Sequence, residues 1–371
     1  MFFIILLVAV ILLITCSLRG YYNFFKKKKH GRILFFVLLI LSIVNLIIAV
    51  KKSKFIPFEF LKNVSYFIAV VTFITFIYSA FLFGVKWIIL KIANCLKCTQ
   101  GKFISFLSSE GKTSAVIFAL MILLSTAGYI NMGTFRQTDY TVRVDKSAEI
   151  SELNCAVISD THIGVGVHAD RLDELVEKIN RLNPDVIFLV GDIVDESTTQ
   201  NDIDKMVKSF QGLKSKMGTF YVSGNHERYA GFDFNKYMEN AGVTVLSDEA
   251  VTVGGNVTII GRKDAYAQRK ELSEICKSNL SQSGPLIVLN HEPLQLEKMS
   301  REGADVTISG HTHGEQFPFT KALFSLANDM MYGTKKYGKM TAVTTSGAGG
   351  WGLHFKLPAK SEIVNLKIIF K

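Results

Sequence analysis

The chain has 371 residues, enough for about two domains, and 49% of them are hydrophobic, which is high for a water-soluble protein. Its net charge of +10 is uneven: residues 1–150 carry 18 Lys/Arg and 5 Asp/Glu, whereas residues 151–371 carry 24 and 27. The first part therefore has a net charge of +13 and the second a net charge of −3. A nucleic-acid-binding domain needs a basic surface, so this distribution argues against a nucleic-acid partner.

The first 130 residues contain four apolar stretches, at about 2–18, 33–50, 64–83 and 115–130. Each approaches the roughly 17–25 residues that a helix needs to cross a bilayer. The sequence therefore predicts a membrane domain over 1–130, built as an all-α bundle of about four transmembrane helices. The first stretch lacks the basic start of a signal peptide, which favours a retained span.

The loops between these stretches predict an orientation. The first and third loops together hold eleven Lys/Arg, while the second loop and the segment after the last span hold seven. Positively charged loops favour the cytoplasmic side. With four spans, both termini and everything after residue 150 lie outside. We therefore expect a multi-pass cell-membrane protein with a globular domain on the extracellular face.

Residues 131–150 are polar and mixed in charge, and they predict a tether between the membrane domain and a globular domain over 151–371. Apolar spacing predicts helices within that domain at 171–182, 202–213, 234–240, 271–278 and 294–302. Short strands at 243–246, 251–253 and 257–260 follow one another without helices, which indicates a second sheet. The expected fold is α/β, a two-sheet sandwich flanked by helices.

Polar side chains follow five buried apolar runs, at 153–159, 185–190, 219–223, 286–290 and 305–309. These side chains are Asp160, His162, Asp192, Asn225, His291, His311 and His313. Ligands of open α/β sheets bind at the carboxyl ends of the strands, so we expect the seven to converge. Carboxylate, amide and imidazole together suit Mn, Fe, Zn or Co better than Ca or Mg alone. One buried His or Asp is more often an ordinary core group, but seven at strand ends favour a metal site.

The same residues stand in ordered motifs: Asp-Thr-His at 160–162, Gly-Asp-Ile-Val-Asp at 191–195, Gly-Asn-His-Glu at 224–227, His291, and Gly-His-Thr-His at 310–313. This order resembles the motif set of the calcineurin-like metallophosphoesterases over residues 151–371. The membrane stretches and the segment after His313 are similar to the membrane-associated YkuE/YaeI-like branch. Glu196 stands where Arg is usual in Ser/Thr protein phosphatases, so a phosphoprotein substrate is not expected.

The resemblance implies two divalent metal ions and hydrolysis of a phosphoester by a metal-activated hydroxide. One ion would be held by Asp160, His162 and His313, the other by Asn225, His291 and His311, with Asp192 bridging. His226 would stabilise developing charge or protonate the leaving oxygen, and Asp195 would orient His226.

Two further basic residues are candidates for substrate binding. Lys356 is expected to hold a phosphate oxygen, since relatives carry a basic residue near that position, and His354 is expected to border the site. The Phe-rich stretch 316–332 suggests a substrate presented by lipid, such as a lipid-linked phosphodiester or pyrophosphate. The alternatives are a non-catalytic metal-binding sensor and a transport protein with an appended domain. The complete ligand set argues against the first, and spans without deep ionisable groups argue against the second.

Overall fold

The computed structural model describes residues 15–22, 59–229, 233–279 and 284–371. It divides into two units, 1–129 and 130–371, and each is described by itself. The described part of the first unit is helical, with residues 15–22 in a helix ahead of three labelled elements. These are α3 Glu59–Cys95, α4 Lys102–Ser108 and α5 Glu110–Met132, the last of which ends inside the second unit.

Two of the described helices are long and apolar enough to cross a membrane, over Asn63–Cys95 and Glu110–Met132. The predicted spans at 64–83 and 115–130 lie within them. The predicted spans at 2–18 and 33–50 lie outside the described residues, except for 15–18. The described chain therefore contains two candidate spans, and the expected bundle of four is not seen there.

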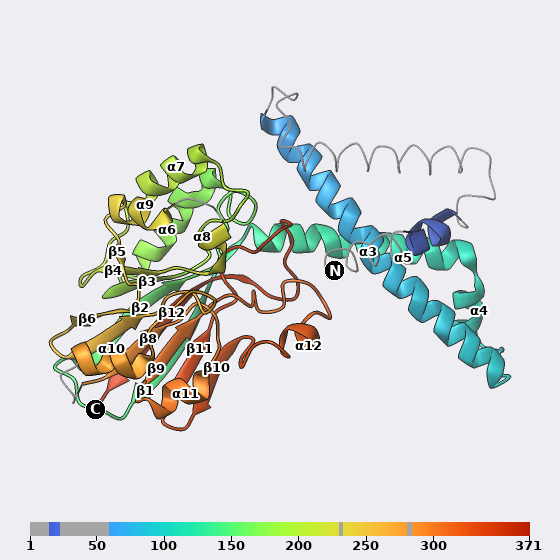
Figure 1. Ribbon diagram of the computed structural model, residues 1–371. Helices are drawn as coiled ribbons and strands as arrows, with labels where there is room; N and C mark the ends of the chain where they lie inside the picture. Colours follow the sequence, from blue (N-terminus) through green and yellow to red (C-terminus); the bar gives the residue numbers. More distant parts are fainter. Residues whose placement is uncertain (1–14, 23–58, 230–232, 280–283) are drawn as a thin grey trace. The chain divides into compact units, whose positions relative to one another are not determined.

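The second unit contains two six-stranded sheets with helices on their outer faces (Figure 1). The first sheet has the order β1-β12-β2-β3-β4-β5 and the second β10-β11-β9-β8-β7-β6. The strands of the first sheet are β1 Phe135–Val144, β12 Ser361–Phe370, β2 Glu152–Ile158, β3 Val186–Val190, β4 Thr219–Val222 and β5 Thr244–Val245. Those of the second are β10 Gly333–Tyr337, β11 Met340–Thr344, β9 Val306–Ser309, β8 Leu286–Leu289, β7 Val257–Gly261 and β6 Glu249–Val253.

The helices form two groups. Those that follow β2, β3 and β4 are η1 Ala169–Arg171, α6 Leu172–Arg181, α7 Gln200–Phe210, α8 Asn225–Tyr229 and α9 Phe234–Asn240. Those of the second half are α10 Leu272–Asn279, α11 Leu296–Arg301 and α12 Lys321–Phe324. Figure 1 shows α6, α7 and α9 over one sheet and α10 and α11 over the other. The predicted α/β sandwich flanked by helices is confirmed.

Local sequence explains the longer helices. In α6 the apolar residues Leu172, Leu175 and Ile179 share one buried face, as 3.6-residue spacing requires. The helix begins with acidic and ends with basic residues, which suits the helix dipole. Thr199 and Asp202 form a capping box at the start of α7.

Three apolar clusters hold the second unit together. One lies between the sheets, where Val157, Phe188 and Ile259 are fully buried. A second cluster joins the first sheet to α6, α7 and α9, and a third joins the second sheet to α10 and α11. The predicted strand at 243–246 contributes β5 to the first sheet, so the second sheet begins one strand later than the sequence indicated.

Residues 131–150 differ from the predicted tether, because ten of them form β1. This strand lies parallel to β12 at the edge of the first sheet, with Phe135 opposite Ser361 and Val144 opposite Phe370. Its side chains Val142 and Val144 are buried in the cluster between the sheets. Alternation of polar and apolar residues in 135–144 suits an edge strand with one face covered. The polar residues of the exposed face made the segment resemble a tether in the sequence.

This arrangement predicts unequal effects of the same substitution at two adjacent residues of β1. Val142 is 3% exposed, so Val142→Asp buries an unpaired carboxylate and should lower the free energy of unfolding by about 3 kcal/mol. Thr141 is exposed, and Thr141→Asp should change it by less than about 0.5 kcal/mol. Urea unfolding of the purified protein measures both. Equal, small effects at the two positions would indicate a tether.

Candidate metal centre

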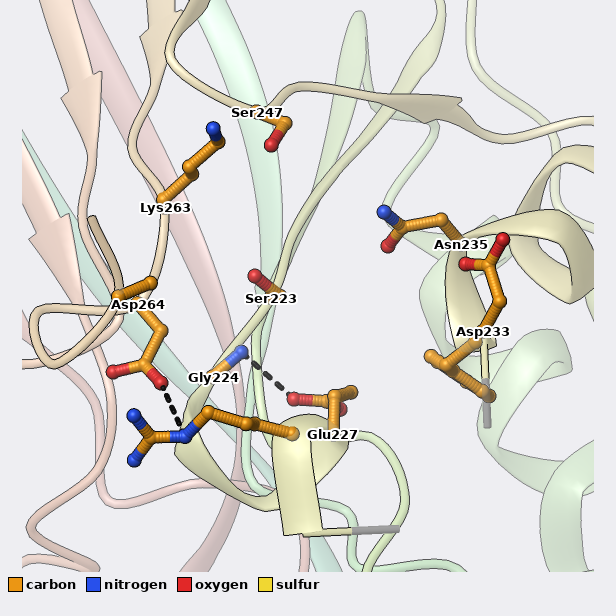
Figure 2. Close-up of a pocket in the computed structure, with 11 residues that line it drawn as sticks. Ser223, Gly224, Glu227, Asp233, Asn235, Ser247, Lys263 and Asp264 are labelled. Carbon is orange, nitrogen blue, oxygen red and sulfur yellow. Dashed lines mark hydrogen bonds and ion pairs between the residues drawn. The ribbon is translucent and has the colours of Figure 1, made fainter. Parts of the chain in front are cut away.

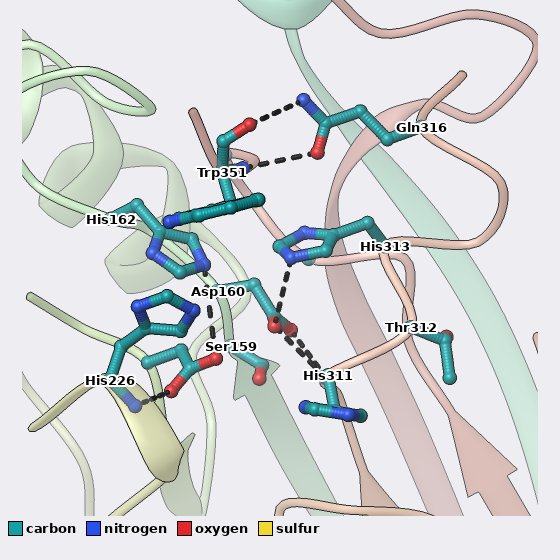
Figure 3. A network of polar contacts seen from close by, with 12 residues as sticks. Ser159, Asp160, His162, His226, His311, Thr312, His313, Gln316 and Trp351 are labelled. Carbon is teal, nitrogen blue, oxygen red and sulfur yellow. Dashed lines mark hydrogen bonds and ion pairs between the residues drawn. The ribbon is translucent and has the colours of Figure 1, made fainter. Parts of the chain in front are cut away.

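The seven predicted ligands come from loops that follow five strands of the two sheets. Asp160 and His162 follow β2, Asp192 follows β3, and Asn225 begins α8 directly after β4. The remaining three follow strands of the other sheet: His291 follows β8, and His311 and His313 follow β9. The structure brings the seven into one cluster, part of which is drawn in Figure 3.

Within this cluster, possible ligand atoms lie within 4.8 Å of one another in three groups. The groups are Asp160/His162/His313, Asp192/His291/His311 and His162/Asp192/His226. Asn225 joins the second group through its Oδ1, which lies 2.9 Å from His311 Nδ1. The sequence-based expectation of convergence at the strand ends is met by the geometry.

Most of these residues have a left-handed backbone, which is uncommon outside glycine. Five of the seven have φ between 42° and 70°: Asp160, His162, Asp192, His311 and His313. This conformation costs roughly 1 kcal/mol or more per residue and is best tolerated by Asn, Asp and His. It turns each side chain sharply from the end of its strand into the shared site. Such strain concentrates at functional sites.

Two glycines permit the close approach of the loops. A Cβ added at Gly224 would overlap Asp192 Oδ1, and one at Gly310 would overlap Ser159 Oγ and Asp160 Oδ2. The space that a side chain would need is therefore filled by ligand carboxylates. Both positions require glycine for contact rather than for turn geometry alone.

Asp192 and His291 form the most tightly paired part of the cluster. His291 Nδ1 lies 2.7 Å from the carbonyl oxygen of Val190, which can only accept, so Nδ1 carries a hydrogen. Nε2 then faces Asp192 Oδ2 at 3.0 Å. Burial would lower the pKa of His291, but Asp192 raises it well above the usual value. A proton on Nε2, or a cation held by the two side chains, would offset the charge of Asp192.

The nitrogen atoms of His162 and His313 also fit a bound cation. Three of these nitrogens have no hydrogen-bond partner among the residues that the structure describes: both ring nitrogens of His162 and the Nδ1 of His313. Asp192 Oδ2 is 3.8 Å from His162 Nε2, and Asp160 Oδ1 is 3.9 Å from His313 Nε2. Buried polar atoms are normally satisfied, so these nitrogens suit metal ligation. The donor set of carboxylates, imidazoles and one amide fits divalent transition metals.

His226 lies beside this cluster, and its partner differs from the prediction. Its Nδ1 is 2.9 Å from Glu196 Oε2, and its backbone N–H donates to Asp192 Oδ1 at 2.8 Å. Asp195, which was expected to orient His226, has its Oδ2 3.5 Å from His162 Nδ1 instead. The backbone explains the difference, since the Ser197 N–H donates to Asp195 Oδ1 and holds that carboxylate toward His162.

Glu227 is a structural residue of the site that the sequence interpretation left without a role. Its buried carboxylate accepts four backbone N–H groups: Asp192 at 3.0 Å, Ile193 at 2.6 Å, Val194 at 3.3 Å and Gly224 at 2.7 Å. It thus joins the loop after β3 to the loop after β4. Burial and the charge of Asp192 raise the pKa of Glu227 to about 7. Its place in the Gly-Asn-His-Glu motif was the available signal.

The two predicted substrate-binding residues have other partners. Lys356 is fully buried, and its three N–H groups donate to the backbone carbonyls of Ser346, Gly347 and Gly349. Burial lowers its pKa to about 8. His354 Nδ1 lies 3.0 Å from the carbonyl oxygen of Val165. Both residues hold loops around the cluster, which disagrees with the predicted phosphate contact of Lys356.

A pocket of about 240 Å³ lies beside the loop after β4 (Figure 2). Gly224 and Glu227 line it together with Lys263 and an ion pair between Arg228 Nε and Asp264 Oδ2 at 3.3 Å. A charged, polar pocket of this kind suits the binding of a polar group rather than an acyl chain.

Comparisons with known proteins agree with this geometry. The profile of the family described as calcineurin-like phosphoesterase matches residues 153–315. A metallophosphoesterase of Helicobacter pylori is 33% identical over 81% of this chain and 80% of its own length. A transmembrane protein with metallophosphoesterase domain from Danio rerio is 26% identical over 70% of this chain and 63% of its own length. The phosphodiesterase YaeI of Escherichia coli is 27% identical over 57% of this chain and 80% of its own length.

The chain belongs to the calcineurin-like metallophosphoesterase family. It is therefore a metal-dependent phosphoesterase, a hydrolase of phosphoester substrates. Two candidate spans and the relatives that are named transmembrane proteins together indicate association with a membrane.

The contacts of Glu227 predict that its substitution loosens the site. Glu227→Gln puts an amide NH₂ against backbone N–H groups, which should cost about 2–3 kcal/mol of unfolding free energy and weaken metal binding. Glu239, an exposed glutamate on α9, is the control, and Glu239→Gln should change neither quantity. Thermal unfolding with and without added Mn²⁺ measures both effects. Equal stability and metal content in the two variants would contradict this role.

Proposed function

We propose that the chain is a membrane-anchored phosphoesterase that holds two divalent metal ions and hydrolyses a phosphoester at the membrane surface. The observation that carries this proposal is the cluster of seven buried or half-buried ligand side chains, in which imidazole nitrogens without hydrogen-bond partners face two carboxylates. The family membership supplies the reaction class.

The proposed ligand sets follow the proximity of the side chains. One ion would be held by Asp160, His162 and His313, the other by Asn225, His291 and His311, and Asp192 would serve both. A carboxylate is the natural bridge, because its two oxygens can bind two cations and its charge offsets both. Asp192 suits this place, since His162 and His291 approach it as separate neighbours. The mixed ligands favour Mn, Fe, Zn or Co.

When bound, such ions polarise the phosphoryl oxygens and lower the pKa of a bound water. The protein contributes the positions of the groups around the phosphorus. His226 is the proposed acid for the leaving oxygen, and Asp192 fixes its backbone while Glu196 fixes its ring. A carboxylate on Nδ1 holds the imidazole in one orientation. Asp195 is assigned to the ligand His162 rather than to His226.

The substrate class follows from location. The proposed substrate is a lipid-linked phosphodiester or pyrophosphate, which a chain anchored in the bilayer meets directly. Support comes from the two apolar helices and from relatives named phosphodiesterase and transmembrane protein. The proposed orientation keeps the catalytic domain on the extracellular face of a multi-pass membrane protein.

The ligand roles predict separable effects of two substitutions. Asp192→Asn removes the bridging charge and should lower kcat for bis(p-nitrophenyl) phosphate by about a thousandfold or more, with loss of bound metal. His226→Ala should lower kcat by about a hundredfold with the metal content unchanged. Glu196→Gln should have a smaller effect in the same direction. Rates and elemental analysis of each protein give the test, and parental activity in Asp192→Asn would overturn the two-metal assignment.

The orientation predicts which face of the membrane exposes the domain. An impermeant protease added to intact cells should degrade residues after 150, because the domain is proposed to lie outside. Detection with an antibody to the C-terminus gives the readout, and lysed cells are the control for protease sensitivity. A domain that is protected in intact cells and cut only after lysis would reverse the proposed orientation.

A further inference from the structure

An unusual amount of apolar surface lies just after the last metal ligand. Residues 317–326, here called the rim segment, include α12 and expose Phe319 by 69%, Leu323 by 65% and Leu326 by 84%. Phe324 on the same segment is 47% exposed. Single exposed apolar residues are common, but four within eight positions of the same short segment, from Phe319 through α12 to Leu326, mark an interaction surface.

The start of the rim segment is fixed to the rest of the domain by hydrogen bonds and ring stacking. Gln316, 5% exposed, donates through Nε2 to the carbonyls of Trp351 and Leu353 at 3.0 and 3.2 Å. Its Oε1 accepts the Trp351 N–H at 3.0 Å. The Phe317 ring stacks on Phe355, with centroids 5.7 Å apart. The inner side of the segment is therefore fixed to residues 351–355, while its outer side faces solvent.

The end of α5 is fixed to the same stretch of chain. Asn131 Nδ2 donates to the carbonyls of Lys356 and Ala359 at 2.7 Å each, and Ser361 Oγ donates to the Met132 carbonyl at 2.8 Å. All these residues belong to the second unit. The helix that could cross the membrane therefore ends on residues 356–361, directly after the stretch that carries the rim segment.

The sheet register puts this attachment at the end of the sheet that carries the metal ligands. Phe135 in β1 lies opposite Ser361, and Val364 lies opposite Val157 in β2, three residues before Asp160. Neighbouring strands are about 4.8 Å apart, so the start of β1 lies roughly 10 Å across the sheet from the strand that leads to Asp160. The chain therefore enters this unit at the end of the sheet that carries the metal ligands.

We propose that the rim segment inserts its apolar side chains into the interface of the bilayer that holds α5. Phe and Leu side chains partition into the boundary between head groups and acyl chains, and Lys321 on the same segment suits anionic head groups. The partner is a lipid surface, because this unit is joined through residues 130–132 to a helix that is long and apolar enough to cross a membrane. This surface goes beyond the proposed phosphoester hydrolysis and does not depend on bound metal.

The docked segment has a direct connection to the catalytic residues. Gln316 holds Trp351, whose ring centroid is 5.6 Å from that of His226 and whose side chain is 45% exposed (Figure 3). Insertion of the rim segment therefore brings the mouth of the metal centre to the level of the lipid head groups. A phosphoester in a head group could then reach the site while its acyl chains stay in the membrane.

Photocrosslinking of the full-length protein in vesicles tests the docking itself. A benzophenone amino acid is placed at Leu323 or Leu326, and at Lys339 as an exposed control in the turn between β10 and β11. In vesicles of phosphatidylcholine and phosphatidylglycerol, the first two positions should form lipid adducts and the control should not. Crosslinks between two copies of the chain, or no lipid adducts at 323 and 326, would overturn the proposal.

A second experiment separates docking from catalysis. The double variant Leu323→Ser/Leu326→Ser changes only exposed side chains and should retain hydrolysis of soluble bis(p-nitrophenyl) phosphate. It should lose about tenfold on phosphatidyl-p-nitrophenol carried in the same vesicles. Equal loss on both probes, or no loss on either, would contradict the docking role. Failure of the parent protein on the soluble probe would instead contradict the proposed function, and the lipid adducts would still report on docking.

Discussion

The site depends on one buried carboxylate, that of Glu227. It accepts backbone N–H groups from the loop after β3 and from the loop after β4. It therefore fixes the distance between the loop that carries Asp192 and the loop that leads to Asn225. Asp192 has a left-handed backbone, which is unfavourable in isolation and persists because these hydrogen bonds hold it. The same residue receives the His226 N–H, so a non-ligand glutamate determines where the bridging carboxylate and the proposed acid stand relative to each other.

Charge in the cluster is balanced locally rather than across the protein. The second half of the chain is nearly neutral, yet Asp160, Asp192 and Asp195 are buried together with histidines. Burial opposes ionisation of these carboxylates, while the surrounding imidazoles favour it. A cluster of this kind is poorly stable without cations, so metal binding and the stability of these loops should be linked.

Much of the catalytic half could be predicted from the sequence, because its signals are local and repeated. Each ligand follows a short apolar run, and the topology of parallel strands brings the ends of those runs together. The contacts between side chains within the site were harder to predict. Glu196 and Asp195 are adjacent, and only the backbone of the loop decides that the first faces His226 and the second His162. Lys356 was predicted to contact phosphate, whereas its ammonium group donates to three backbone carbonyls. No sequence pattern indicates contacts with backbone carbonyls.

The strand β1 has a consequence for how the chain is made. It follows α5 and leaves the ribosome before the rest of its sheet, yet its backbone partner in that sheet is β12, which is synthesised after every other strand of both sheets. Until β12 is synthesised, the edge of β1 that pairs with β12 has no hydrogen-bonding partner from that strand. The first sheet can close only when residues 361–370 emerge, so folding of the domain is a late event, and β1 is exposed to wrong pairing until then.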